Sequence, residues 1–199
     1  GGMVLISVGS GTSSVGGMVQ AHAGRSTVHT GGAVVVTSGE GTATSSGVVL
    51  IRSSNSGEAG VSGSLLFSSG TSVTGNSGRV HMGTGAATAG RGGAVVVTVG
   101  SGTSGSGGLV QAHAGRSTVH TGGEVHVSSG EGTATSSGAI TIRSVNAGAA
   151  GTSGYLSFSS GSSVTGNSGY IHMGTGVATA GRGGMVLISV GSGTSSVGG

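Results

Sequence analysis

Cysteine, proline, tryptophan, lysine and aspartate are all absent from this chain of 199 residues. The absence of cysteine excludes disulfide bonds, and the absence of aspartate excludes calcium-binding β-roll turns and a Ser-His-Asp triad. Glycine is abundant, at 49 residues, but without proline and without a three-residue period it does not indicate collagen. Tyr and Phe, at two each, are rare.

Charge is scarce as well: charged residues make up 6% of the chain and the net charge is +3. A charge so small and scattered predicts no nucleic-acid partner. Apolar runs reach about five residues, far short of the roughly 20 needed to cross a bilayer, so no membrane partner is predicted. Such low charge together with 34% hydrophobic residues also argues against a solvated disordered chain.

No arrangement of residues points to catalysis. No carboxylates lie close together in the sequence, and no lysine follows the glycine-rich stretches as it would in a phosphate-binding loop. His22 and His29 share one repeat but should lie on different walls of the predicted fold. The sequence therefore predicts no enzyme, no cofactor and no metal site.

The chain repeats itself on a long period. Gly1–Gly17 is identical to Gly183–Gly199, and a closely related string begins at Gly92, so one copy follows another every 91 residues. We predict a single repetitive domain over residues 1–199, with half-units 1–91 and 92–182 and the start of a next unit at 183–199. This organisation indicates a window of a longer array.

A shorter period of about 15 residues lies within each half, where a single member is longer by one position. Each repeat opens with a glycine; the second and fourth residues after it are apolar, and the sixth is always Val, Ala, Ser or Thr. This alternation is typical of a strand, and one short strand needs stacked neighbours to become buried. The opening glycines are Gly2, Gly17, Gly32, Gly47, Gly63, Gly78, Gly93, Gly108, Gly123, Gly138, Gly154, Gly169 and Gly184.

These repeats predict an all-β fold: a parallel β-solenoid (β-helix) with rungs of about 15 residues and a thin core, assembled laterally into a filament. A flat antiparallel sheet of the silk type is the alternative. Glycines at the eighth position of the rungs are expected to take corners with positive φ, and the longer rungs at Gly47 and Gly138 to form bulged corners. The corner glycines are Gly9, Gly24, Gly39, Gly70 and Gly85.

Apolar residues also occupy positions expected to face outward. Large exposed apolar columns are rare on monomeric proteins, so we predict a lateral interface between copies. Its residues are Met3, Leu5, Met18, Val35, Val48, Leu50, Leu66, Val96, Leu109, Tyr155, Tyr170, Met185 and Leu187. At matching positions of neighbouring rungs, Arg25 with Glu40 and Arg116 with Glu131 are expected to form inter-rung ion pairs.

Two strings carry a resemblance: Ser46-Gly-Val-Val-Leu-Ile-Arg-Ser53 and Ser62-Gly-Ser-Leu-Leu-Phe-Ser-Ser-Gly70. They resemble tandem Gly/Ser-rich repeats in long secreted proteins of algae and other aquatic microbes. The resemblance implies an extracellular or cell-surface structural protein, such as a surface or flagellar-hair fibre. Any glycan would be O-linked, because no Asn-x-Ser/Thr sequence occurs.

The sequence thus predicts a structural subunit of an extracellular filament that polymerises with itself. An ice-binding β-solenoid is one alternative, suggested by Thr42-Ala-Thr44, although the threonine column breaks at Glu58 and Val73. The stalk of an adhesin is another.

Overall fold

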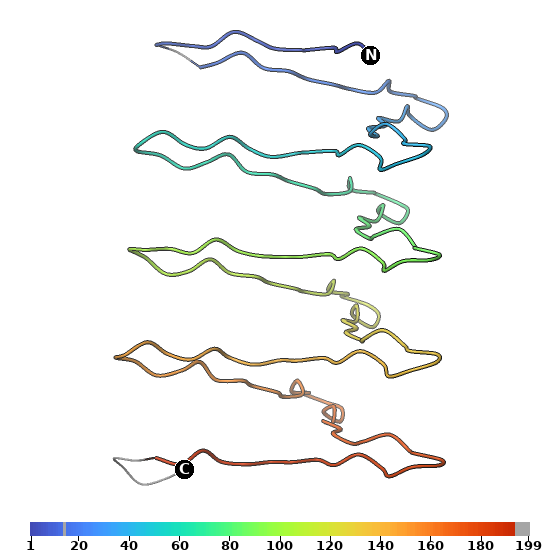
Figure 1. The fold of residues 1–199 in the computed structure, drawn as a ribbon, viewed down its shortest axis with the longest axis vertical. Helices are drawn as coiled ribbons and strands as arrows, with labels where there is room; N and C mark the ends of the chain where they lie inside the picture. Colours follow the sequence, from blue (N-terminus) through green and yellow to red (C-terminus); the bar gives the residue numbers. More distant parts are fainter. Residues whose placement is uncertain (14, 194–199) are drawn as a thin grey trace. The chain divides into compact units, whose positions relative to one another are not determined.

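The backbone consists of extended segments joined by short bends (Figure 1). The computed structural model describes residues 1–13 and 15–193, and within these ranges there is neither helix nor strand. Residues 194–199, the end of the predicted partial unit 183–199, lie outside the described residues. No helix able to cross a membrane occurs in the described ranges.

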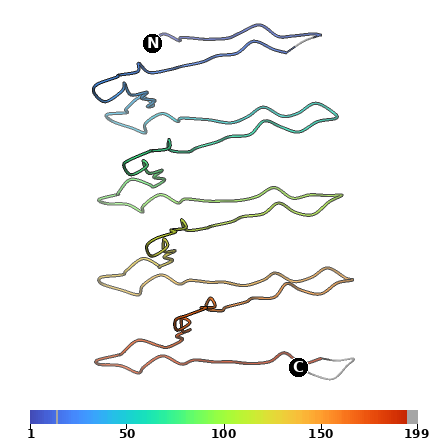
Figure 2. The same ribbon diagram turned by 180° about the vertical axis from the view of Figure 1, so that it is seen from behind.

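Two units make up the chain, Gly1–Thr98 and Val99–Gly199, and each alternates extended segments with bends in the same way. Figure 2 shows these reversals from behind. The bends follow one another with the short period of the sequence, and the steps to residues 58–60 and 149–151 are longer by one position. They lie at 12–13, 27–29, 42–44, 58–60, 73–75 and 88–90, and at 103–105, 118–120, 133–135, 149–151, 164–166 and 179–181.

Each bend is flanked by a close contact between two segments, which we call a closing pair. It joins the glycine that opens a repeat to the small residue nine or ten positions before it. A methyl group on Gly47, for example, would lie 3.3 Å from Cβ of Ser38. The twelve closing pairs are Val8–Gly17, Ala23–Gly32, Ser38–Gly47, Ser53–Gly63, Ser69–Gly78, Thr84–Gly93, Val99–Gly108, Ala114–Gly123, Ser129–Gly138, Ser144–Gly154, Ser160–Gly169 and Thr175–Gly184.

The closing pairs explain two regularities of the sequence. Glycine is favoured at the opening position because at seven of the twelve closing pairs a Cβ would lie closer than 3.4 Å to the preceding segment. In the twelve closing pairs the sixth residue after the opening glycine lies beside the next opening glycine, which limits its size. Both choices allow the backbone to reverse direction with its two segments in contact.

Hydrogen bonds reinforce many of these reversals. In five of them the N–H of the opening glycine donates to the carbonyl of the glycine eight residues earlier, at N–O distances of 2.8–3.1 Å. These bonds run from Gly17 to Gly9, Gly32 to Gly24, Gly47 to Gly39, Gly123 to Gly115 and Gly138 to Gly130. In two others the Thr84 and Thr175 hydroxyls donate to the carbonyls of Gly93 and Gly184.

Serine hydroxyls stabilise four of the bends from inside. Ser26 Oγ accepts from the N–H of His29 at 2.9 Å, and Ser72 Oγ accepts from the N–H of Gly75 at 3.1 Å. The same two bonds recur in the second unit, from His120 to Ser117 and from Gly166 to Ser163. A serine hydroxyl at the start of a turn thus replaces a backbone acceptor.

The predicted parallel β-solenoid is wrong, because the described residues form no strand. The alternative, a silk-type antiparallel sheet, is contradicted for the same reason, because it too consists of strands. A strand needs a ladder of hydrogen bonds, whereas neighbouring segments here share at most one backbone bond beside each bend. The predicted thin core is also missing, since no described residue is buried.

The predicted corners with positive φ are wrong as well. Over the described ranges, positive φ occurs only at Gly60 and Gly151, at 157° and 158°. Gly60 and Gly151 are the last residues of the bends 58–60 and 149–151, which lie one position farther from the preceding bend than the other bends do. The chain turns within the bend residues themselves, so the glycines at the eighth position keep ordinary φ values, and the extra residue is accommodated at Gly60 and Gly151.

Gly60→Ala should therefore weaken the bend at 58–60. Although its Cβ would have open space, with Ser56 Cβ 4.0 Å away, the backbone there disfavours any side chain. We expect a cost of about 1 kcal/mol, roughly a fivefold loss of the bend population measured by NMR couplings and amide exchange. Gly57→Ala is the matched control, because nothing lies within 4 Å and its φ is ordinary. Equal effects of the two substitutions would contradict the assignment.

Candidate self-association surface

Every large apolar side chain of the described residues is exposed to solvent, at least to about half of its surface. The accessible surface is 19761 Å². A folded monomer of 18.2 kDa exposes roughly 8,000 Å², and the fully unfolded chain about 26,000 Å². The extended segments and bends therefore bury only about a third of the surface that a globular fold would bury. Most of the hydrophobic stabilisation encoded in the sequence is left unused within the single chain.

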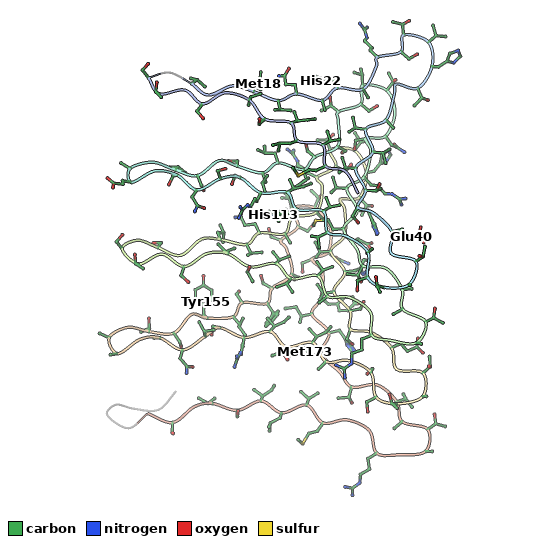
Figure 3. The ribbon with its side chains drawn as sticks, turned by 45° about the horizontal axis from the view of Figure 1, so that its top comes forward. Met18, His22, Glu40, His113, Tyr155 and Met173 are labelled. Carbon is green, nitrogen blue, oxygen red and sulfur yellow. The ribbon has the colours of Figure 1, made fainter. Side chains whose placement is uncertain are left out.

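The thirteen residues of the predicted lateral interface all lie on extended segments, and each is 72–89% exposed. Figure 3 shows side chains of this set, such as Met18 and Tyr155, standing off the ribbon. Nothing in the described chain covers any of the thirteen. Their accessibility permits contact with another molecule, and the lateral interface itself stays a prediction.

Of the two columns expected to face inward, the one at the second residue after each opening glycine is exposed too, but less so. Its members from Val19 onward are 46–62% exposed, whereas Val4, which has no preceding segment, is 90% exposed. Each member lies two residues after an opening glycine, where the closing pair brings the preceding segment near. The column comprises Val4, Val19, Val34, Val49, Leu65, Val80, Val95, Val110, Val125, Ile140, Leu156, Ile171 and Val186.

The expected ion pairs between Arg25 and Glu40 and between Arg116 and Glu131 are not formed among the residues that the structure describes. The backbone reverses between successive repeats, and the close approaches beside the bends join residues nine or ten positions apart, not the equal positions that Arg25 and Glu40 occupy.

A different polar contact joins Glu124 Oε2 to His126 Nε2 at 2.7 Å. Sequence reasoning missed this pair. Its signal was the spacing of two residues, which places both side chains on the same side of an extended segment. Both partners are largely exposed, so the pair contributes little to stability.

Residues 1–13 and 15–193 contain no pocket, and they contain no group of three or more metal-ligating side chains that could hold an ion. The chain matches no protein-family model, no curated protein and no solved structure. The exposed apolar segments are therefore the feature from which a function can be argued.

Proposed function

We propose that this protein is a structural subunit that associates with copies of itself to build an extracellular filament. The observation that carries the proposal is the exposure of every large apolar side chain on the described extended segments. Apolar surface of this extent is unfavourable in water, and contact with further copies removes it from solvent.

The distribution of this surface favours an open polymer over a closed dimer. A standard protein interface buries about 1,600 Å² in total. This is a small part of the surface that the chain exposes beyond that of a folded monomer of the same mass. Apolar residues recur on segment after segment in both units, so one chain offers contact sites to several neighbours at once. Repeated contacts between unlike surfaces generate fibres when the geometry does not close.

Low charge supports the same function. With a net charge of +3 and 6% charged residues, copies repel one another only weakly. The resemblance to secreted Gly/Ser-rich repeats supports a location outside the cell or at its surface. Any glycan on the filament would be O-linked, on the exposed Ser and Thr hydroxyls of the bends.

The test is the association state of the full chain diluted from denaturant over a series of concentrations. We expect sedimentation velocity and light scattering to show particles that grow with concentration, and negative-stain electron microscopy to show elongated filaments. A single 18.2 kDa species across the whole series would contradict self-association. Small closed oligomers that stop growing would contradict the filament.

A further inference from the structure

Three extended segments differ from all the others in one combination of features. Residues 3–8, 94–99 and 185–190 contain no charged residue, histidine or glutamine, and each ends in valine at the closing position. The remaining described segments have Ala, Ser or Thr at the closing position. We call these three the valine segments; two of them, 3–8 and 185–190, are identical.

The valine segments are apolar on both faces. In residues 3–8 the alternating side chains Val4, Leu5 and Ile6 are 90%, 75% and 75% exposed. In residues 94–99, Val95, Val96 and Val97 are also exposed. An extended segment with apolar residues on both faces is normally covered on both faces.

The backbones of the valine segments have no backbone hydrogen bond to the rest of the described chain, a property that they share with the other extended segments. A Cβ on Gly108 would overlap Val99 Cγ1, and within the described chain no bond joins Gly108 N to Gly100 O. At the Ala114–Gly123 closing pair the equivalent bond measures 2.8 Å, and at Val8–Gly17 it is the longest of the five, at 3.1 Å. Valine at the closing position thus occurs with this bond at Gly17 and without it at Gly108, and the peptide groups of the valine segments themselves have no backbone partner in the described chain.

The partner that fits such a segment is the same segment of a second copy. Unpaired extended backbone is a template for another chain, and six-residue apolar stretches with no charge and no proline pair most readily with their own sequence. Like copies meet here without charge repulsion, because the valine segments carry none.

We infer that copies of this chain first join by pairing the backbones of their valine segments. This inference rests on the proposed self-association and specifies where it begins. Contacts through the other exposed apolar residues, such as Leu50 and Tyr155, follow once the valine segments have aligned two chains.

The experiment compares two triple variants of the full chain. Leu5→Lys/Val96→Lys/Leu187→Lys adds one charge to each valine segment. Gln20→Lys/Gln111→Lys/Ser157→Lys, the matched control, adds the same charge at the same position of other repeats. All six positions lie on extended segments and are exposed, and no residue of the described chain is buried, so neither variant disturbs a core.

We expect the first variant to raise the concentration at half-assembly at least about tenfold, since like charges would face each other across the paired copies. The control should change it by less than about twofold, because its charges can remain in solvent. In assembled wild-type protein, hydrogen–deuterium exchange should be slowest at residues 3–8 and 94–99 and faster at 18–23 and 109–114.

Equal shifts in the two variants, or uniform exchange protection, would overturn the inference while leaving self-association intact. A wild-type chain that stays monomeric would instead overturn the proposed function, and the inference with it.

Discussion

Gly41→Ala combined with Gly132→Ala is expected to open the bends at 42–44 and 133–135. A Cβ on Gly41 would overlap the carbonyl oxygen of Ser45 and lie 3.0 Å from that of Thr44. Gly132 is equally confined, by the carbonyls of Ser136 and Thr135. The obstacles are backbone atoms, which cannot rotate aside as a side chain does, so we expect a cost of about 1–3 kcal/mol per bend.

The closure of the bend at 42–44 can be followed by NMR, because the chain has no cysteine and Thr37→Cys creates a unique site for a nitroxide label. In the parent, the Gly47 amide, which donates to Gly39 O at 2.9 Å, should relax rapidly near the label. In the Gly41→Ala variant most of this rapid relaxation should be lost, and the Gly47 amide proton should exchange faster with solvent. Gly39→Ala is the control, since its Cβ would meet nothing within 4 Å. Indistinguishable behaviour of the two variants would refute the assigned geometry.

Exchanging the residues of two closing pairs should exchange their hydrogen bonding. Val99→Ala removes the contact with Gly108 and is expected to let its N–H bond to Gly100, slowing exchange of that amide about two- to tenfold. Ala114→Val crowds Gly123, whose Cβ would already lie 3.3 Å from Ala114 Cβ, and should weaken the 2.8 Å bond to Gly115, because the equivalent bond beside Val8 is the longest of the five, at 3.1 Å. We expect this crowding to cost about 1–3 kcal/mol.

Amide exchange at Gly108 and Gly123 measures both effects in opposite directions. Val97→Ala serves as control, because Val97 lies two residues earlier on the same side and does not contact the glycine. If Val99→Ala leaves Gly108 unchanged, valine is not what keeps that reversal open.

The periodicity of the sequence indicated where the repeats begin, but not how each reversal is built. The glycine and the small residue that recur in every repeat lie together at each of the twelve reversals. The two longer repeats mark the places where Gly60 and Gly151 adopt positive φ. Such features depend on residues within ten positions of one another, and short-range sterics decide them.

What the sequence did not reveal is the partner of each extended segment. Alternation at Val4, Leu5 and Ile6 indicates two faces, but it carries no information on which backbone lies alongside. Arg25 and Glu40 occupy the same position of successive repeats, which likewise suggested that they meet. The backbone reverses at 27–29 between them, and they form no ion pair in the described chain. For the candidate surface, the sequence indicates which residues are apolar, whereas the lesser exposure of Val19 and its equivalents depends on how closely the preceding segment approaches them.

The closing pairs have a consequence for the length of the array. Since each reversal is completed by atoms at most ten positions apart, its contact order is minimal and no distant part of the molecule is needed to form it. Duplication or deletion of a whole repeat would thus leave every other reversal undisturbed. Evolution can change the size of such a protein in modular steps without redesigning what already exists.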